Sequence, residues 1–127
     1  METIKIIGTD DTPSVTLDAQ NDIFEISGRS LPEDVTAFYE PILDWLTRYS
    51  ANPNSKTVLN FKLVYFNTAS SKILLDILLK LEEIFEAGND VLVRWHFPDD
   101  DEDMEEAGQE YADIVEIPFE QVSYTMD

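Results

Sequence analysis

Residues 57–97 constrain the fold most strongly, because two apolar strands flank a long amphipathic helix there. Residues 57–66 have apolar side chains on both sides of the expected strand, which predicts a central strand covered over most of both faces. Residues 70–87 have a wide apolar stripe at helical spacing and end before Gly88, a common helix terminator. Residues 91–97 predict a second buried strand. Because the connections are short, these segments predict a βαβ unit with parallel strands and a right-handed crossover.

The N-terminal part of the chain has the pattern of short strands. Residues 3–7 are β-prone, and apolar side chains alternate with polar ones in residues 15–17 and 23–27. Asn21 and Asp22 lie between the last two segments and are typical of a tight turn. We therefore expect an antiparallel hairpin near the N-terminus.

Two further helices and a short C-terminal segment complete the pattern. Residues 33–51 have a helical stripe that contains Pro41, and a proline there predicts a kink or a helix in two parts. Residues 102–115 predict a last helix, and residues 118–124 fit either a final strand or an extended tail. The predicted fold class is α/β, with a mixed sheet, an N-terminal antiparallel hairpin, a parallel βαβ unit and helices packed on the sheet. We expect residues 1–127 to form a single domain.

The charge of the chain restricts its partners. Lys and Arg total 8, Asp and Glu total 27, and the formal net charge is −19. This balance argues against binding to nucleic acid or to anionic membrane lipids, because both need clustered basic side chains. Residues 97–127 contain 12 acidic residues and no Lys or Arg. That part of the chain therefore predicts either a solvated acidic helix or a surface for a basic partner.

Several classes of chemistry are excluded or weakened by composition. The chain has no cysteine, which excludes disulfides, thiolate zinc sites and cysteine nucleophiles. Its longest unbroken apolar run has four residues, and no basic region precedes an apolar segment at the N-terminus. We therefore expect a cytoplasmic protein that neither spans nor binds a membrane.

The main candidate site lies between the strand of residues 57–66 and the helix that follows. It consists of six consecutive residues, namely Asn67, Thr68, Ala69, Ser70, Ser71 and Lys72. Free N–H groups and the helix dipole favour negative charge at a helix N-terminus, so a phosphate on one of the hydroxyls would be stabilised there. The alternative is ordinary capping, because Asn, Ser and Thr are preferred helix caps. Three hydroxyls are more than one cap needs.

Two other candidates are weaker. The acidic residues 99–103, together with Glu110, partly match a calcium-binding EF-hand loop, but Met104 stands where that loop needs glycine. His96, the only histidine, could act as a general base, although a structural role is the simpler interpretation. We therefore predict no catalytic residue, no metal ligand and no cofactor.

Three segments resemble the SiaC family of bacterial regulatory phosphoproteins. They are residues 65–72, residues 93–97, and the early Gly8-Thr9 with Thr12-Pro13. The resemblance implies a STAS-like α/β fold similar to that of the antagonists of anti-sigma factors. It also implies a regulatory switch and not an enzyme.

The resemblance further implies how the switch works. Thr68 would be phosphorylated by a dedicated protein kinase and dephosphorylated by a PP2C-type phosphatase. The unmodified form would bind and stimulate a diguanylate cyclase, which raises cyclic-di-GMP and favours biofilm formation. The neighbours Asn67, Ala69, Ser70, Ser71 and Lys72 would form the partner-binding loop, with Ser70 and Ser71 shaping or capping the helix.

Two other functions remain open at this point. An acidic decoy that occupies a basic protein surface is supported by the charge of residues 97–127. A small hydrolase that uses carboxylates, with or without a metal, is the third possibility. Binding by a decoy would weaken steeply with salt and would not depend on Thr68.

Overall fold

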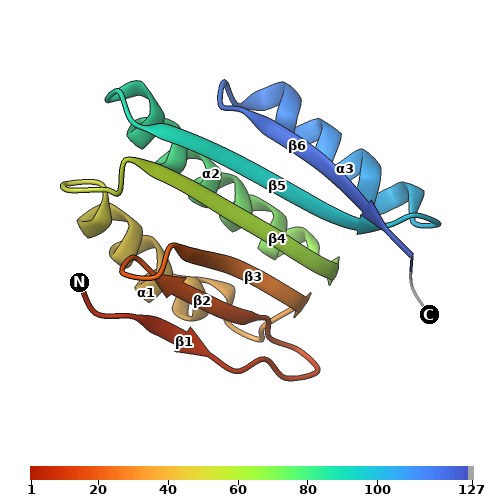
Figure 1. The fold of residues 1–127 in the computed structure, drawn as a ribbon. Coiled ribbons are helices and arrows are strands. Elements are labelled where there is room, and N and C mark those ends of the chain that lie inside the picture. Colours follow the sequence, from red (N-terminus) through yellow and green to blue (C-terminus); the bar gives the residue numbers. More distant parts are fainter. Residues whose placement is uncertain (126–127) are drawn as a thin grey trace.

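Six strands form one mixed sheet in which the spatial order equals the chain order (Figure 1). The computed structural model describes residues 1–125. The strands are β1 (Ile4–Ile6), β2 (Ser14–Asp18), β3 (Ile23–Ser30), β4 (Lys56–Phe66), β5 (Asp90–Pro98) and β6 (Phe119–Tyr124). The pairs β1–β2 and β2–β3 are antiparallel, whereas β3–β4, β4–β5 and β5–β6 are parallel. The predicted hairpin and βαβ unit are thus confirmed, and the C-terminal segment is a strand.

All three helices lie on the same face of this sheet, as Figure 1 shows. They are α1 (Val35–Tyr49), α2 (Thr68–Glu86) and α3 (Glu102–Ile114). Each helix connects two neighbouring parallel strands, and each connection moves across the sheet in the same direction. Crossovers of one hand that move in one direction must place their helices on one face.

The other face of the sheet is open, which corrects the prediction for the central strand. Along β4, alternate side chains are fully buried, namely Thr57, Leu59, Phe61 and Leu63. The side chains between them are exposed or half-buried, namely Lys56, Val58, Asn60, Lys62 and Val64. The prediction that this strand is covered over most of both faces was therefore wrong. The valines suggested burial, but β-branched side chains also suit a half-exposed pleated surface.

Helix α1 runs through Pro41 without interruption, so the interpretation of a helix in two parts was wrong. The proline leaves the carbonyl of Ala37 without its usual helical donor. Both residues are exposed, so water can satisfy that carbonyl. The helix begins at an Asp34 cap, whose carboxylate accepts a hydrogen bond from the Ala37 N–H at 3.1 Å.

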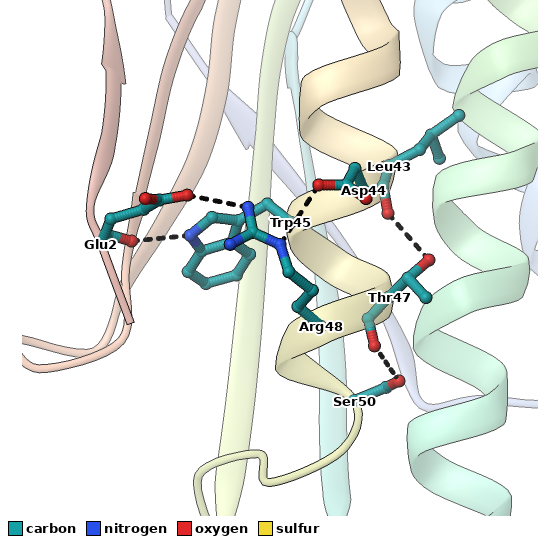
Figure 2. Close-up of polar contacts among 7 residues, drawn as sticks. All are labelled: Glu2, Leu43, Asp44, Trp45, Thr47, Arg48 and Ser50. Atoms are coloured by element: carbon teal, nitrogen blue, oxygen red, sulfur yellow. Dashed lines mark hydrogen bonds and ion pairs between the residues drawn. The ribbon is translucent and has the colours of Figure 1, made fainter.

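The N-terminal segment is fastened to α1 by the contacts in Figure 2. The buried Trp45 indole N–H donates to the Glu2 carbonyl at 2.7 Å. Arg48 bridges the Glu2 carboxylate at 2.8 Å and the Asp44 carboxylate at 3.1 Å. The ion pairs are exposed and contribute little, so the indole hydrogen bond and the packing of Trp45 hold this end of the chain.

The second tryptophan, Trp95 on β5, positions α3. Its indole ring is buried, and its N–H donates to the Met104 carbonyl at 3.0 Å. Gly108 lies directly over the ring, and a Cβ there would overlap the indole. A helical glycine at this position is therefore required by close packing, although glycine is a poor helix former.

We predict that Gly108→Ala destabilises the protein by about 1–3 kcal/mol, because the added methyl group must displace the Trp95 ring or α3. Helix propensity alone would predict that the substitution stabilises the protein, because alanine is a better helix former than glycine. Urea unfolding followed by tryptophan fluorescence measures the change, with Gln109→Ala at the neighbouring exposed position as the control. A Gly108→Ala variant as stable as the control would contradict this packing.

Candidate functional site

The candidate segment lies at the carboxyl end of β4, where only Asn67 separates the strand from α2. The Asn67 side chain caps the helix, because its oxygen accepts a hydrogen bond from the Ser70 N–H at 2.9 Å. The helix begins at Thr68, two residues before the predicted start. Thr68 therefore belongs to the first helical turn and not to a loop.

The three hydroxyls of this segment have different environments. The Ser70 side chain is fully buried and donates to the Ser30 carbonyl at 2.9 Å. The Ser71 hydroxyl is half-buried and donates to the Thr68 carbonyl at 2.6 Å. Thr68 is exposed, and its hydroxyl makes no hydrogen bond within residues 1–125. Among the three, only Thr68 offers a free hydroxyl to another protein.

Ser70 is part of a buried chain of hydroxyl groups. Ser30 at the end of β3 contacts Ser70 Oγ at 2.9 Å, and Tyr39 on α1 contacts Ser30 Oγ at 2.6 Å. Because Ser70 uses its proton on the Ser30 carbonyl, Ser30 must donate to Ser70 and Tyr39 must donate to Ser30. Burial raises the pKa of Tyr39, which keeps its hydroxyl protonated for this role. The chain ties the first turn of α2 to β3 and α1.

A second tyrosine holds the same turn from the other side. Tyr111 on α3 donates its hydroxyl proton to the Ser71 carbonyl at 2.7 Å. Burial is the main cause of a raised pKa at Tyr111, so this phenol also stays protonated. Ser30, Tyr39 and Tyr111 were not predicted from the sequence. They lie about 30 to 40 residues from the segment, and no local pattern marks them.

The surface beside Thr68 is shaped by an irregularity in the sheet. Gly28 pairs with Leu63 but Arg29 pairs with Tyr65, so Val64 is an extra residue in β4. Consequently Val64 and Tyr65 are both exposed, while Phe66 packs towards the helices.

A shallow hollow of about 230 Å³ lies between these side chains and the start of α3. Tyr65 is 45% exposed, and the Arg29 guanidinium lies over its ring at 5.4 Å. The hollow thus lies at the end of β4, directly before the helical turn that contains Thr68.

The two weaker candidates were the acidic residues 99–103 with Glu110, and His96. Asp101 caps α3 by accepting from the Met104 N–H at 3.0 Å, and Glu110 lies within the helix. Within residues 1–125 no group of three or more His, Asp or Glu side chains could hold a metal ion. His96 lies on the open face of the sheet, where its Nε2 atom contacts Asn60 Oδ1 at 2.9 Å.

Comparisons with known proteins identify the family. Residues 6–124 match the model of the SiaC family regulatory phosphoproteins. The chain belongs to the SiaC family. An uncharacterised protein of Pseudomonas aeruginosa strain UCBPP-PA14 is 33% identical to it over 119 residues, which cover 94% of each chain.

Solved structures of this family have the same fold. SiaC of Pseudomonas aeruginosa is 31% identical and superimposes with a TM-score of 0.89, over 98% of this chain and 100% of that chain. A second match is a crystal structure in which SiaC of the same organism is the activator in complex with the diguanylate cyclase SiaD. There the TM-score is 0.90 at 31% identity, over 95% of this chain and 99% of that chain. The predicted family and mixed α/β fold are therefore confirmed.

Among residues 1–125, no helix combines the length and the apolar character that crossing a bilayer would need.

We predict that Ser70→Ala lowers the free energy of unfolding by about 1–3 kcal/mol. The substitution leaves the buried Ser30 hydroxyl without its acceptor and removes the hydrogen bond from Ser70 to the Ser30 carbonyl. Ser71→Ala is the matched control and removes a hydroxyl one position along, which is only half-buried and bonds to the adjacent turn. Its loss should stay below about 1 kcal/mol. Urea unfolding measures both, and equal losses would argue against the buried chain.

We also predict that the His96 imidazole titrates below its ordinary pKa of 6.5. Burial and the nearby charges of Lys62 and Arg94 disfavour its protonated form. The unfolded chain then binds a proton more readily, so this contribution lowers stability as the pH falls through 6.5. NMR titration of the single histidine measures the pKa, and His96→Gln should remove this part of the acid dependence. A midpoint above 6.5 would contradict the assignment.

Proposed function

We propose that this protein is a non-enzymatic switch that regulates a diguanylate cyclase and is controlled by phosphorylation of Thr68. A protein kinase adds the phosphate and a PP2C-type phosphatase removes it. The observation that carries this proposal is the free, exposed hydroxyl of Thr68 beside two serines that are engaged in hydrogen bonds. The family description as regulatory phosphoproteins and the complex of the related SiaC with a cyclase support it.

The first turn of α2 suits a phosphate. The helix N-terminus has free N–H groups and a positive dipole end, which stabilise a phosphate carrying about −1.5 to −2 charges. Lys72 lies one turn further along the same helix face, is exposed, and makes no ion pair within residues 1–125. A phosphate on Thr68 can therefore be accepted without disturbing the buried contacts beneath it.

The unmodified threonine suits a partner instead. Its hydroxyl is small and neutral, and it follows the exposed side chains of Val64 and Tyr65 at the end of β4. The proposed partner covers both this apolar surface and Thr68. Because a phosphate would then lose its water, modification should release the partner.

We predict that Thr68→Ala binds the diguanylate cyclase of the same organism with wild-type affinity, whereas Thr68→Glu binds about ten-fold or more weakly. Isothermal titration calorimetry with the purified proteins measures both affinities. Thr47→Glu, which adds the same charge at an exposed position of α1, is the control and should bind like the wild type.

Two results would contradict this function. Equal affinities of Thr68→Ala and Thr68→Glu would exclude a switch at this residue. Binding only to basic surfaces, with a steep loss in salt and no effect of Thr68, would support the acidic decoy instead. Intact-mass analysis of protein from its native cells, with and without a PP2C-type phosphatase, tests directly for a single phosphate on Thr68.

A further inference from the structure

Tyr39 lies beneath the candidate site and cannot be touched from outside the molecule. Its side chain is 0% exposed, as are those of Ser30 and Ser70, so no partner of the folded chain contacts any of the three. The Tyr39 hydroxyl contacts Ser30 Oγ at 2.6 Å, and Ser30 Oγ donates to Ser70 Oγ at 2.9 Å. Any influence of Tyr39 on the surface at Thr68 must therefore pass through these buried contacts.

The residues on both sides of Thr68 are bonded to the same carbonyl group. The Asn67 N–H donates to the Ser30 carbonyl at 3.1 Å, and the Ser70 hydroxyl donates to it at 2.9 Å. Within the turn, the Ser70 N–H donates to the Asn67 side chain at 2.9 Å, and the Ser71 N–H donates to the Asn67 carbonyl at 3.0 Å. The backbone of Thr68 is thus fixed between two contacts with Ser30.

The Ser30 side chain is itself held from two directions. It accepts a proton from Tyr39 and donates its own proton to Ser70, and these two bonds set the rotation of the hydroxyl. Without the Tyr39 proton, the Ser30 hydroxyl keeps one partner and can rotate to another staggered position. The Ser70 side chain would then lose the contact from Ser30, and the first turn of α2 would move more freely.

We propose that Tyr39 is a positioning residue for the phosphorylation of Thr68, because it holds Ser30 and thereby the turn that contains the acceptor hydroxyl. This role rests on the proposed function and adds a buried residue on which its regulation depends. Phosphoryl transfer needs the attacking oxygen in line with the leaving group. A threonine held in one position therefore reacts faster than one that moves among several.

The transfer itself involves Thr68 and groups that the kinase supplies. The Thr68 Oγ atom attacks the γ-phosphorus of a nucleoside triphosphate, and the bond from that phosphorus to the oxygen shared with the β-phosphate breaks. A nucleoside diphosphate leaves, and the hydroxyl proton passes to a base of the kinase. Within residues 1–125 nothing forms a hydrogen bond with the Thr68 hydroxyl, so the part of this chain is to hold the oxygen in place.

A second buried tyrosine on α1 provides a matched control. The Tyr49 hydroxyl contacts Thr57 Oγ1 at 2.8 Å and accepts a hydrogen bond from the Asn54 N–H at 3.0 Å. Thr57 lies near the start of β4, about 30 Å along the strand from its carboxyl end. Tyr39→Phe and Tyr49→Phe each remove one bonded hydroxyl from the same helix, but only the first removes it beside the acceptor turn.

The test is steady-state phosphorylation of the full chain by the protein kinase of the same organism, followed by intact-mass analysis. Tyr39→Phe should lower kcat about ten-fold and leave KM within about two-fold of the wild type. The reason is that a buried residue changes the position of the acceptor and not the surface that the kinase contacts. Tyr49→Phe should keep the wild-type kcat, although both variants should lower the midpoint of urea unfolding.

Ser30→Ala tests the connection between Tyr39 and Thr68. It removes the middle of the hydroxyl chain and should lower kcat at least as much as Tyr39→Phe. Because groups in one hydrogen-bond network are not additive, the double variant should be no slower than Ser30→Ala alone. Losses that multiply in the double variant would overturn the route through Ser30.

Hydrogen exchange tests the same role without the kinase. The Ser71 N–H bonds to the Asn67 carbonyl inside the turn, and it should exchange about ten-fold faster in Tyr39→Phe than in the wild type. In Tyr49→Phe its exchange should be much closer to the wild-type rate. Equal exchange in the two tyrosine variants would overturn the positioning role, whether or not the kinase acts on Thr68.

The remaining outcomes separate the positioning role from the proposed function. If the wild type takes up no phosphate at Thr68, the proposed function is overturned and the positioning role with it. If the wild type is phosphorylated and Tyr39→Phe has the same kcat, or both tyrosine variants lose kcat equally, only the positioning role is overturned. A raised KM with an unchanged kcat would also overturn it, because that result would indicate an altered docking surface.

Discussion

The common hand and direction of the three crossovers is the constraint on which the rest of the structure depends. Because β3, β4, β5 and β6 follow one another across the sheet, all their connecting helices lie on one face. The same order brings the end of β3, the end of β4 and the start of α2 to one edge. Ser30 and Asn67 meet there, and the Asn67 N–H donates to the Ser30 carbonyl at 3.1 Å. The candidate site forms because residues that are far apart in the chain lie next to one another at this edge.

The hydroxyls at the start of α2 differ in their hydrogen bonding: that of Ser70 is buried and bonded, whereas that of Thr68 is free in the described part of the chain. Ser70 is held by Ser30, and Ser30 by Tyr39, so the first turn of α2 has a fixed position. Thr68 makes no such contact within residues 1–125, and its side chain can gain a charge without a loss of buried hydrogen bonds. Under the proposed function, a phosphate on Thr68 would change the surface that a partner meets and would leave the fold intact.

The two faces of the molecule differ in how their charges are balanced. On the open face of the sheet, Lys62 pairs with Glu25 at 2.7 Å and Arg94 pairs with Glu120 at 3.5 Å. Helix α3 has no basic residue to balance its carboxylates. A partner with basic residues would therefore complement the carboxylates of α3.

The local sequence pattern was sufficient to predict most of the helices and strands. The hairpin, the βαβ unit and the capping segment followed from residues that are neighbours in the chain, since turn residues and apolar periodicity act over a few positions. The prediction of a strand covered on both faces failed at Val58 and Val64. The same side chains fit a buried or a half-exposed strand, and only the direction of the crossovers decides between them.

By itself, the sequence determined the family, the α/β class and the position of Thr68 beside a helix N-terminus, because these depend on short motifs and periodicity. The tertiary structure alone decided that Ser70 is buried, that the Thr68 hydroxyl is free within residues 1–125, and that Tyr111 of α3 bonds to the first turn of α2. Each of these depends on residues such as Ser30, Tyr39 and Tyr111. They are distant in the chain and come together only when the sheet orders the helices.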